Sequence, residues 1–183
     1  MIPRPIAWVS TRSATGIANL APYSFFTAVG SRPPTLLFCP ANRRDGTAKD
    51  SLVNILETKQ FVVNVVSHEL AESMNLSAAE IPPEESEFDL TQEATAESSV
   101  VNVPRVARSP ASLECELLQH IPIGGGPGGA NIVVGKIVHL HLDDAVVDQH
   151  GFADPQLMDL IGRMGGSSYC RTEDVFEMRR PRV

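Results

Sequence analysis

The chain has 183 residues, of which 43% are hydrophobic and 20% are charged. This is an ordinary globular composition at the usual size of one domain, so we expect residues 1–183 to form a single domain. The formal net charge of −7 leaves no basic surface for a phosphate backbone, which excludes nucleic acid as an expected partner.

The cysteines and the start of the chain bear on its location. Cys39, Cys115 and Cys170 are widely spaced and form no pair of the kind that a disulfide framework or a zinc ribbon requires. No stretch is apolar over the ~18 residues that a membrane helix needs, and residues 1–5 lack the order of a signal peptide. We therefore expect a cytoplasmic protein with no membrane association.

Strand patterns open the chain. Residues 6–13 are apolar and β-branched, residues 14–16 (Ala-Thr-Gly) are typical of a turn, and residues 18–31 continue with aromatic and small residues. This order predicts a β-hairpin. Residues 35–39 are nearly all apolar, which is typical of a buried central strand, and Cys39 is expected to lie in the core.

Residues 47–59 have the clearest helical pattern. Thr47 and Asp50 form a variant of the capping box, and the apolar positions that follow share one helical face. A strand over residues 61–66 and a short helix over residues 68–76 are expected next.

The second half of the chain predicts further strands. Residues 84–99 are acidic and rich in Ser and Thr, and we interpret them as a solvated surface loop. Strands are expected over residues 111–120 and 132–144, and the alternation in the latter predicts that Val138, Leu140 and Leu142 face away from a wet side. Short strands with two helical insertions and no βαβ rhythm predict a mainly β fold, a β-barrel.

Two motifs resemble binding sites without the expected context. Gly124, Gly126 and Gly129 have dinucleotide-fingerprint spacing, but a strand follows them where that fingerprint opens a helix, so we interpret them as a flexible hairpin or substrate-side loop. His139 and His141 have a spacing that can hold a metal. Because no third ligand is apparent from the sequence, we assign them to a solvated face and expect no metal site.

Two clusters carry candidate chemistry. Residues 3–11 and 19–26 place hydroxyl residues, prolines and aromatics on adjacent strands, a mixture that suits a flat heterocycle such as an isoalloxazine. Arg43, Arg44 and Lys49 surround a helix start that suits a monophosphate. The alternatives are a hairpin that only supplies core aromatics, Trp8 among them, and a capped surface helix. Together the clusters suit a mononucleotide flavin.

At these residues the sequence resembles the flavin reductase-like, FMN-binding split-barrel family, in the branch of flavoredoxins and monooxygenase reductase components. The matching stretches run in family order and are residues 4–11 (RPIAWVST), 19–26 (NLAPYSFF), 49–54 (KDSLVN), 61–64 (FVVN), 87–88, 113–115, Gly135 and 163–169 (RMGGSSY). Members usually carry a segment before the first motif, which begins here at Arg4, so a truncated start stays an open alternative.

The resemblance implies a Greek-key split barrel that forms a homodimer, with one FMN per subunit near the dimer interface. The residues that it assigns to the flavin ring and ribityl chain are Ser10, Thr11, Tyr23, Ser24 and Phe25. Those that it assigns to the phosphate are Lys49, Asp50 and Ser51, with Arg43 or Arg44 as helpers. It also brings a C-terminal segment with Arg163 and Tyr169 to the flavin.

The activity implied is hydride transfer from NADH or NADPH to FMN, with electrons passed on to a monooxygenase or another acceptor protein. Such a transfer requires no protein acid or base at the reacting carbon, so the sequence identifies no catalytic residue. The alternatives are a non-enzymatic, flavoredoxin-like FMN electron carrier, or a barrel that binds haem or a deazaflavin.

Overall fold

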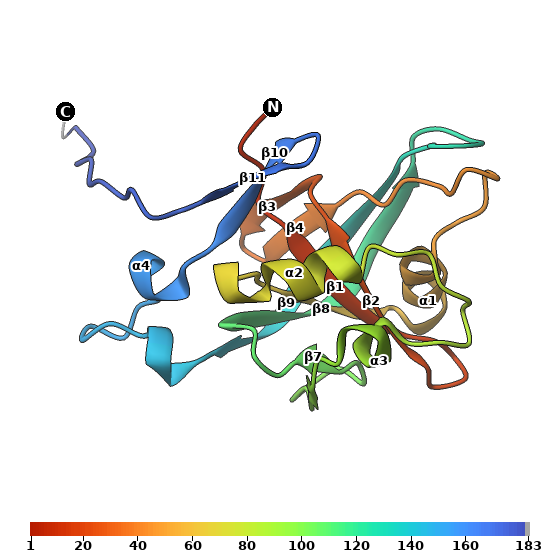
Figure 1. Ribbon diagram of the computed structural model, residues 1–183, viewed down its shortest axis with the longest axis horizontal. Coiled ribbons are helices and arrows are strands. Elements are labelled where there is room, and N and C mark those ends of the chain that lie inside the picture. The colour runs from red at the N-terminus through yellow and green to blue at the C-terminus, as the bar shows by residue number, and fades with distance from the viewer. Residues whose placement is uncertain (182–183) are drawn as a thin grey trace.

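The computed structural model describes residues 1–181, and its main feature is one large antiparallel sheet (Figure 1). Seven strands form it in the order β2-β1-β5-β8-β9-β4-β3. Their bounds are β1 (Ala7–Arg12), β2 (Ala18–Tyr23), β3 (Phe26–Ser31), β4 (Pro34–Phe38), β5 (Gln60–Asn64), β8 (Ala111–Pro122) and β9 (Asn131–Leu142). Two small sheets pair β6 (Thr95–Ala96) with β7 (Arg105–Val106) and β10 (Ile161–Gly165) with β11 (Ser168–Arg171).

The connection between the two edge strands forces this sheet to curl. A flat sheet of seven strands would hold β2 and β3 about 29 Å apart, at about 4.8 Å per strand. Only Ser24 and Phe25 join these strands, and so short a connection crosses at most about 11 Å. The sheet therefore bends into an open barrel whose seam lies between β2 and β3, and the predicted mainly β, split-barrel fold is confirmed.

The hairpin prediction is right for its first half and wrong for its second. β1 and β2 pair antiparallel, with Ala7 opposite Tyr23 and Arg12 opposite Ala18. Residues 18–31 do not form one strand, however, because the chain leaves β2 at Tyr23 and pairs β3 with β4 across the seam. The nearest proline, Pro22, lies within β2 itself, so it does not mark the break at Ser24 and Phe25.

Four short helices accompany the strands in the described residues: α1 (Asp50–Thr58), α2 (Ala71–Leu76), α3 (Glu87–Thr91) and α4 (Pro155–Met158). The predicted helix begins at Asp50, not at Thr47, because Thr47 donates from its amide and its hydroxyl to Asp45 Oδ1, at 2.8 and 2.6 Å, in a preceding turn. None of these helices has the length and apolar character that crossing a lipid bilayer requires.

Apolar side chains pack on both faces of the sheet. Phe38, Phe61 and Ile55 belong to a fully buried cluster between the curled strands and α1. Trp8 lies in a second cluster with α2 and α3, is fully buried and donates from Nε1 to Ser77 Oγ at 2.8 Å. Trp8 is thus a core residue. Cys39, predicted to lie in the core, is partly exposed, because the chain leaves β4 at Phe38 just before it.

The acidic segment 84–99 is not the solvated loop that its composition predicts. It contains α3 and β6, and within α3 both Glu87 and Phe88 are buried. Phe88 packs in the Trp8 cluster, and the Glu87 carboxylate accepts the Leu20 amide hydrogen at 2.9 Å. Ser86 Oγ also donates to the Ala18 carbonyl at 2.7 Å, so one aromatic residue and two hydrogen bonds hold this acidic segment against β2.

The longest hairpin of the sheet contains the glycine-rich motif and both strand histidines. Residues 124–129 form the turn between β8 and β9, as predicted. The orientation predicted for β9 is partly wrong, because Leu140 is 54% exposed whereas His141 is partly buried beside the carboxylate of Glu114. Residues 99–101 cover that side of the sheet by hydrogen bonding to Glu114.

Replacing Trp8 tests the second cluster. Trp8→Ala leaves a large cavity and removes the donor to Ser77, so we expect the free energy of unfolding to fall by about 3–5 kcal/mol. Trp8→Phe fills most of that volume and should cost less. Urea denaturation followed by circular dichroism measures both losses. An unchanged midpoint for Trp8→Ala would show that the indole contributes no packing energy.

Candidate functional site

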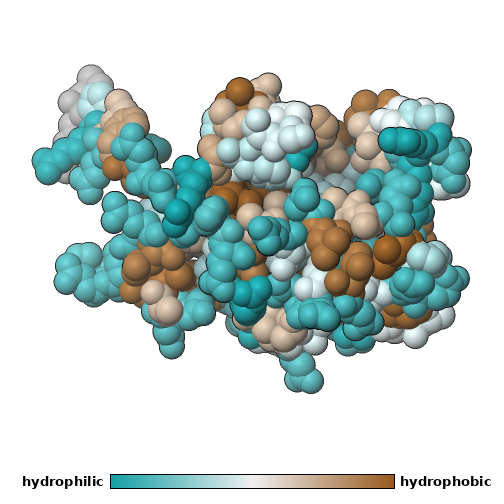
Figure 2. All heavy atoms as spheres, viewed as in Figure 1, coloured by the Kyte–Doolittle hydropathy of each residue, from teal (hydrophilic) through white to brown (hydrophobic). Residues whose placement is uncertain are grey.

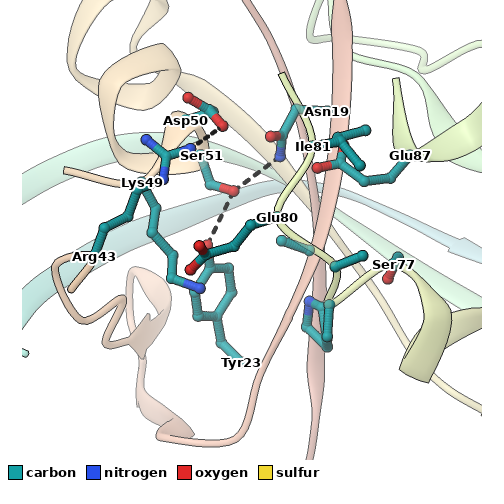
Figure 3. Close-up of a pocket in the computed structure, with 14 residues that line it drawn as sticks. Asn19, Tyr23, Arg43, Lys49, Asp50, Ser51, Ser77, Glu80, Ile81 and Glu87 are labelled. Atoms are coloured by element: carbon teal, nitrogen blue, oxygen red, sulfur yellow. Dashed lines mark hydrogen bonds and ion pairs between the residues drawn. The ribbon is translucent and has the colours of Figure 1, made fainter. Parts of the chain in front are cut away.

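Two adjoining hollows run along edge strand β2 and share Pro22, Tyr23 and Ala78 in their walls. We call them together the β2 groove. Its first hollow lies at the N-terminus of α1 and is lined by residues including Asn19, Tyr23, Lys49, Ser51 and Glu80 (Figure 3). Its second hollow, of about 370 Å³, lies between β2, α2 and the β10–β11 hairpin and is lined by residues including Arg4, Ile6, Ser24, Met74, Arg163 and Tyr169.

Ser51 forms the polar centre of the first hollow. Its side chain is 1% exposed, and Oγ accepts hydrogen bonds from Asn19 Nδ2 at 2.9 Å and from the Tyr23 hydroxyl at 3.0 Å (Figure 3). Burial raises the pKa of Tyr23 to about 12, against the opposing effect of the Ser51 hydrogen bond, so Tyr23 remains a donor at neutral pH. With both neighbours donating, the hydrogen of Ser51 is free to bond to a third group.

The start of α1 adds positive potential at the same place. Lys49 is the N-cap, and no side chain caps the helix there, so amides of the first turn stay available to an anion. The Lys49 ammonium takes part in no hydrogen bond or ion pair within residues 1–181. Arg43, in contrast, is engaged: it pairs with Asp50 and donates to the Ala48 carbonyl at 2.9 Å. Lys49 is therefore the available cation.

The second hollow brings three distant segments together. Arg4 and Arg163 pair through their backbones, at 3.0 and 2.8 Å. The Arg4 guanidinium lies 5.3 Å from the centroid of the Phe25 ring and donates from Nε to Ser24 Oγ at 3.2 Å. Arg163 in turn lies 4.7 Å from the centroid of the Tyr169 ring. The N-terminal segment, the β2–β3 connection and the β10–β11 hairpin thus form one wall with two cations and the Tyr169 ring, and the Phe25 ring lies beside it.

The structure gathers most of the predicted site residues but not all of them. Those that line the β2 groove are Tyr23, Ser24, Arg43, Lys49, Asp50, Ser51, Arg163 and Tyr169, and Phe25 lies beside it, next to Arg4. Ser10 and Thr11 lie outside the groove in the fully buried core, where Ser10 donates to the Pro104 carbonyl at 2.6 Å and Thr11 accepts from Asn54 at 3.0 Å. Arg44 is exposed and also lies outside.

Several residues of the groove were not predicted from the sequence. Arg4 and Asn19 stand in the family motifs of residues 4–11 and 19–26, so the sequence contained a pattern that could have identified them. Residues 77–81, which close the first hollow, contain no pattern that would have predicted this role. This loop is positioned by Ser77, which accepts from Trp8 across 69 positions of sequence and donates to the Met74 carbonyl at 2.8 Å.

Comparisons with known proteins agree on one family. A family model described as a flavin reductase like domain matches residues 1–163. An uncharacterized protein from Deinococcus radiodurans is 44% identical over 98% of this chain and 81% of its own length. Nitrilotriacetate monooxygenase component B from Bacillus cereus has a TM-score of 0.90 at 32% identity, covering 97% of this chain and 88% of that one. The 2-nitrobenzoate 2-nitroreductase from Pseudomonas fluorescens has a TM-score of 0.88 at 32% identity, covering 99% and 86%.

Glu87, beside the first hollow, makes stability depend on pH. Burial raises its pKa above the ordinary 4.5, against the opposing effect of the Leu20 amide. The folded state therefore holds this proton more tightly than the unfolded state. The free energy of unfolding should fall as pH rises above about 4.5 and through the raised pKa of the folded state, because the proton that stabilises the folded state is then lost. Glu87→Gln, which keeps the acceptor, should remove this dependence and be more stable than the natural chain at pH 7. Urea denaturation of both chains across this pH range measures the difference, and parallel curves would contradict the assignment.

Proposed function

Because the chain belongs to the flavin reductase-like family, we propose that it binds FMN in the β2 groove and transfers a hydride from NADH or NADPH to that flavin. The observation that carries this proposal is the pairing of two unlike sites in one groove. One hollow offers an available cation, a free hydroxyl hydrogen and an uncapped helix N-terminus, and the adjoining hollow offers aromatic and apolar walls.

The donors of the first hollow suit the FMN phosphate. Lys49 supplies charge, Ser51 supplies a hydroxyl hydrogen that no acceptor in residues 1–181 uses, and the first turn of α1 supplies amides. The acidic groups nearby oppose a dianion only in part. Asp50 is paired with Arg43 and the Glu87 carboxylate accepts from the Leu20 amide, whereas Glu80, which also lines this hollow, takes part in no ion pair within residues 1–181.

The second hollow suits the flavin ring. Ile6, Pro22 and Met74 supply apolar contact, and Arg4 and Arg163 supply donors for the polar edge of the ring. FMN, when bound, supplies the hydride acceptor. The side chains have only to hold and orient the flavin and to leave one face open to a nicotinamide, and Tyr169, at the wall of this hollow, is 37% exposed.

We further propose a homodimer that delivers electrons to a second protein. Phe152 and Leu157, around α4, are 70% and 55% exposed, and Figure 2 shows apolar side chains gathered there. Apolar surface of this kind suits contact with another chain. The similarity to a monooxygenase component supports a monooxygenase or another electron-acceptor protein as the recipient.

Lys49→Ala tests the phosphate end, with Arg44→Ala as the matched control. Charge-assisted hydrogen bonds are each worth roughly 1.5–3 kcal/mol, so we expect FMN to bind Lys49→Ala about tenfold or more weakly. Arg44 is exposed and outside the groove, so its loss should leave the affinity unchanged. Quenching of FMN fluorescence measures both constants. Equal affinities for the two variants would refute the phosphate assignment.

An anaerobic assay tests hydride transfer. Purified protein with FMN and either NADH or NADPH should bleach the visible flavin absorbance faster than free FMN with the same nucleotide. FMN that stays bound through dialysis but is not reduced by either nucleotide would favour the flavoredoxin-like carrier. A protein that retains no FMN, and does not enhance its reduction, would remove both functions.

A further inference from the structure

A carboxylate and two imidazoles meet on β8 and β9, outside the β2 groove. Glu114 lies opposite His139 in the register of the two strands, and His141 follows two positions later on the same side of β9. The potential ligand atoms of Glu114, His139 and His141 all lie within 4.8 Å of one another. The cross-strand register thus supplies the third ligand that the spacing of the histidines alone did not reveal.

Backbone hydrogen bonds hold the Glu114 carboxylate in place and leave one of its lone pairs for a further partner. It is fully buried, and its carboxylate accepts three backbone hydrogen bonds, from Ser99 at 2.6 Å, Val100 at 2.7 Å and Val101 at 2.9 Å. A carboxylate offers about four lone-pair sites, so the amides leave one, on Oε1, which accepts from His141 Nε2. Outer hydrogen bonds of this kind orient the carboxylate ligands of metal sites.

The two histidines lie where they and Glu114 could bind the same ion. Their ring centroids are 4.6 Å apart, and both side chains are partly exposed. Within residues 1–181 the His139 ring takes part in no hydrogen bond, so its nitrogens stay available. One side of the cluster is therefore a buried carboxylate, and the other is open to an ion arriving from solvent.

We propose that Glu114, His139 and His141 bind a divalent transition-metal ion, with zinc as the expected metal. Two imidazoles and one carboxylate are a known donor set for Zn²⁺, and they leave a coordination position for water. Mg²⁺ and Ca²⁺ prefer oxygen ligands alone, so the imidazole pair selects against them. Binding the ion would break the hydrogen bond between His141 and Glu114, which is 2.5 Å long, and the partly exposed His141 ring would move away from Oε1 to make room for the ion. The hydrogen of the His141 ring would then be carried by Nδ1.

Such an ion would link three segments of the chain. β8 and β9 contribute the ligands, and residues 99–101 are tied to the site by the hydrogen bonds of Glu114. Because the ion binds the folded chain only, it should raise the melting temperature.

Zinc titration of the chelator-treated full chain, free of any histidine tag, tests the site. We expect isothermal calorimetry to show one Zn²⁺ per chain, and Co²⁺ in its place to give the visible spectrum of a tetrahedral or five-coordinate site. His139→Ala and His141→Gln should each weaken binding at least tenfold. In the second variant the glutamine amide retains a donor for Glu114 but offers the metal no imidazole. His150→Ala, an exposed histidine outside the cluster, is the control and should bind as the natural chain does.

The outcomes separate clearly. The His139 ring has no hydrogen bond to lose in the described part of the chain, so His139→Ala should keep its circular dichroism spectrum. It serves as the deciding variant if His141→Gln folds poorly. Zinc binding that is lost in His139→Ala and kept in His150→Ala supports the site. The absence of saturable zinc binding overturns the proposed site. Zinc binding that His139→Ala leaves unchanged also overturns it, because the ion would then be held elsewhere.

Discussion

The architecture depends on the two-residue connection between β2 and β3, the strands at opposite edges of the sheet. So short a connection cannot cross a flat sheet, so the sheet curls until its edges approach each other. Curling creates an interior, which Phe38, Phe61 and Ile55 fill, and it leaves a seam where β2 has no strand partner on one side among residues 1–181. The groove that we propose as the flavin site runs along this strand.

Each wall of the β2 groove comes from a different part of the chain, and buried polar contacts hold the walls in place. The Ser51 hydroxyl ties α1 to Asn19 and Tyr23 of β2. Trp8 fixes Ser77 and thereby the loop that closes the first hollow. The Arg4–Arg163 backbone pair brings the β10–β11 hairpin against the N-terminal segment. Core and site share these residues, so a change that loosens the packing of Trp8 should also disturb the groove.

Most of the strands and the motifs could be predicted from local patterns. Strands with clear turn residues at their ends, and the helix with a regular apolar face, were found within a few residues of their positions. The break between β2 and β3 was missed, because a run of aromatic and small residues carries no mark of where a curled sheet exchanges partners. The burial of Glu87 and Phe88 was missed, because one aromatic side chain and hydrogen bonds from Ser86 and to Glu87 hold a segment whose composition is otherwise acidic.

The sequence alone determined the family resemblance, the order of the motifs and the kinds of side chain available for a phosphate and a flat ring. Tertiary structure decided which of those side chains face the groove. β1 is buried on both sides, so no alternation shows that Ser10 and Thr11 point into the core, and neighbours in sequence such as Arg43 and Arg44 differ because only one reaches Asp50. Glu114 meets His139 only through strand register, which is set by packing and turns far from either residue and is not visible in local sequence.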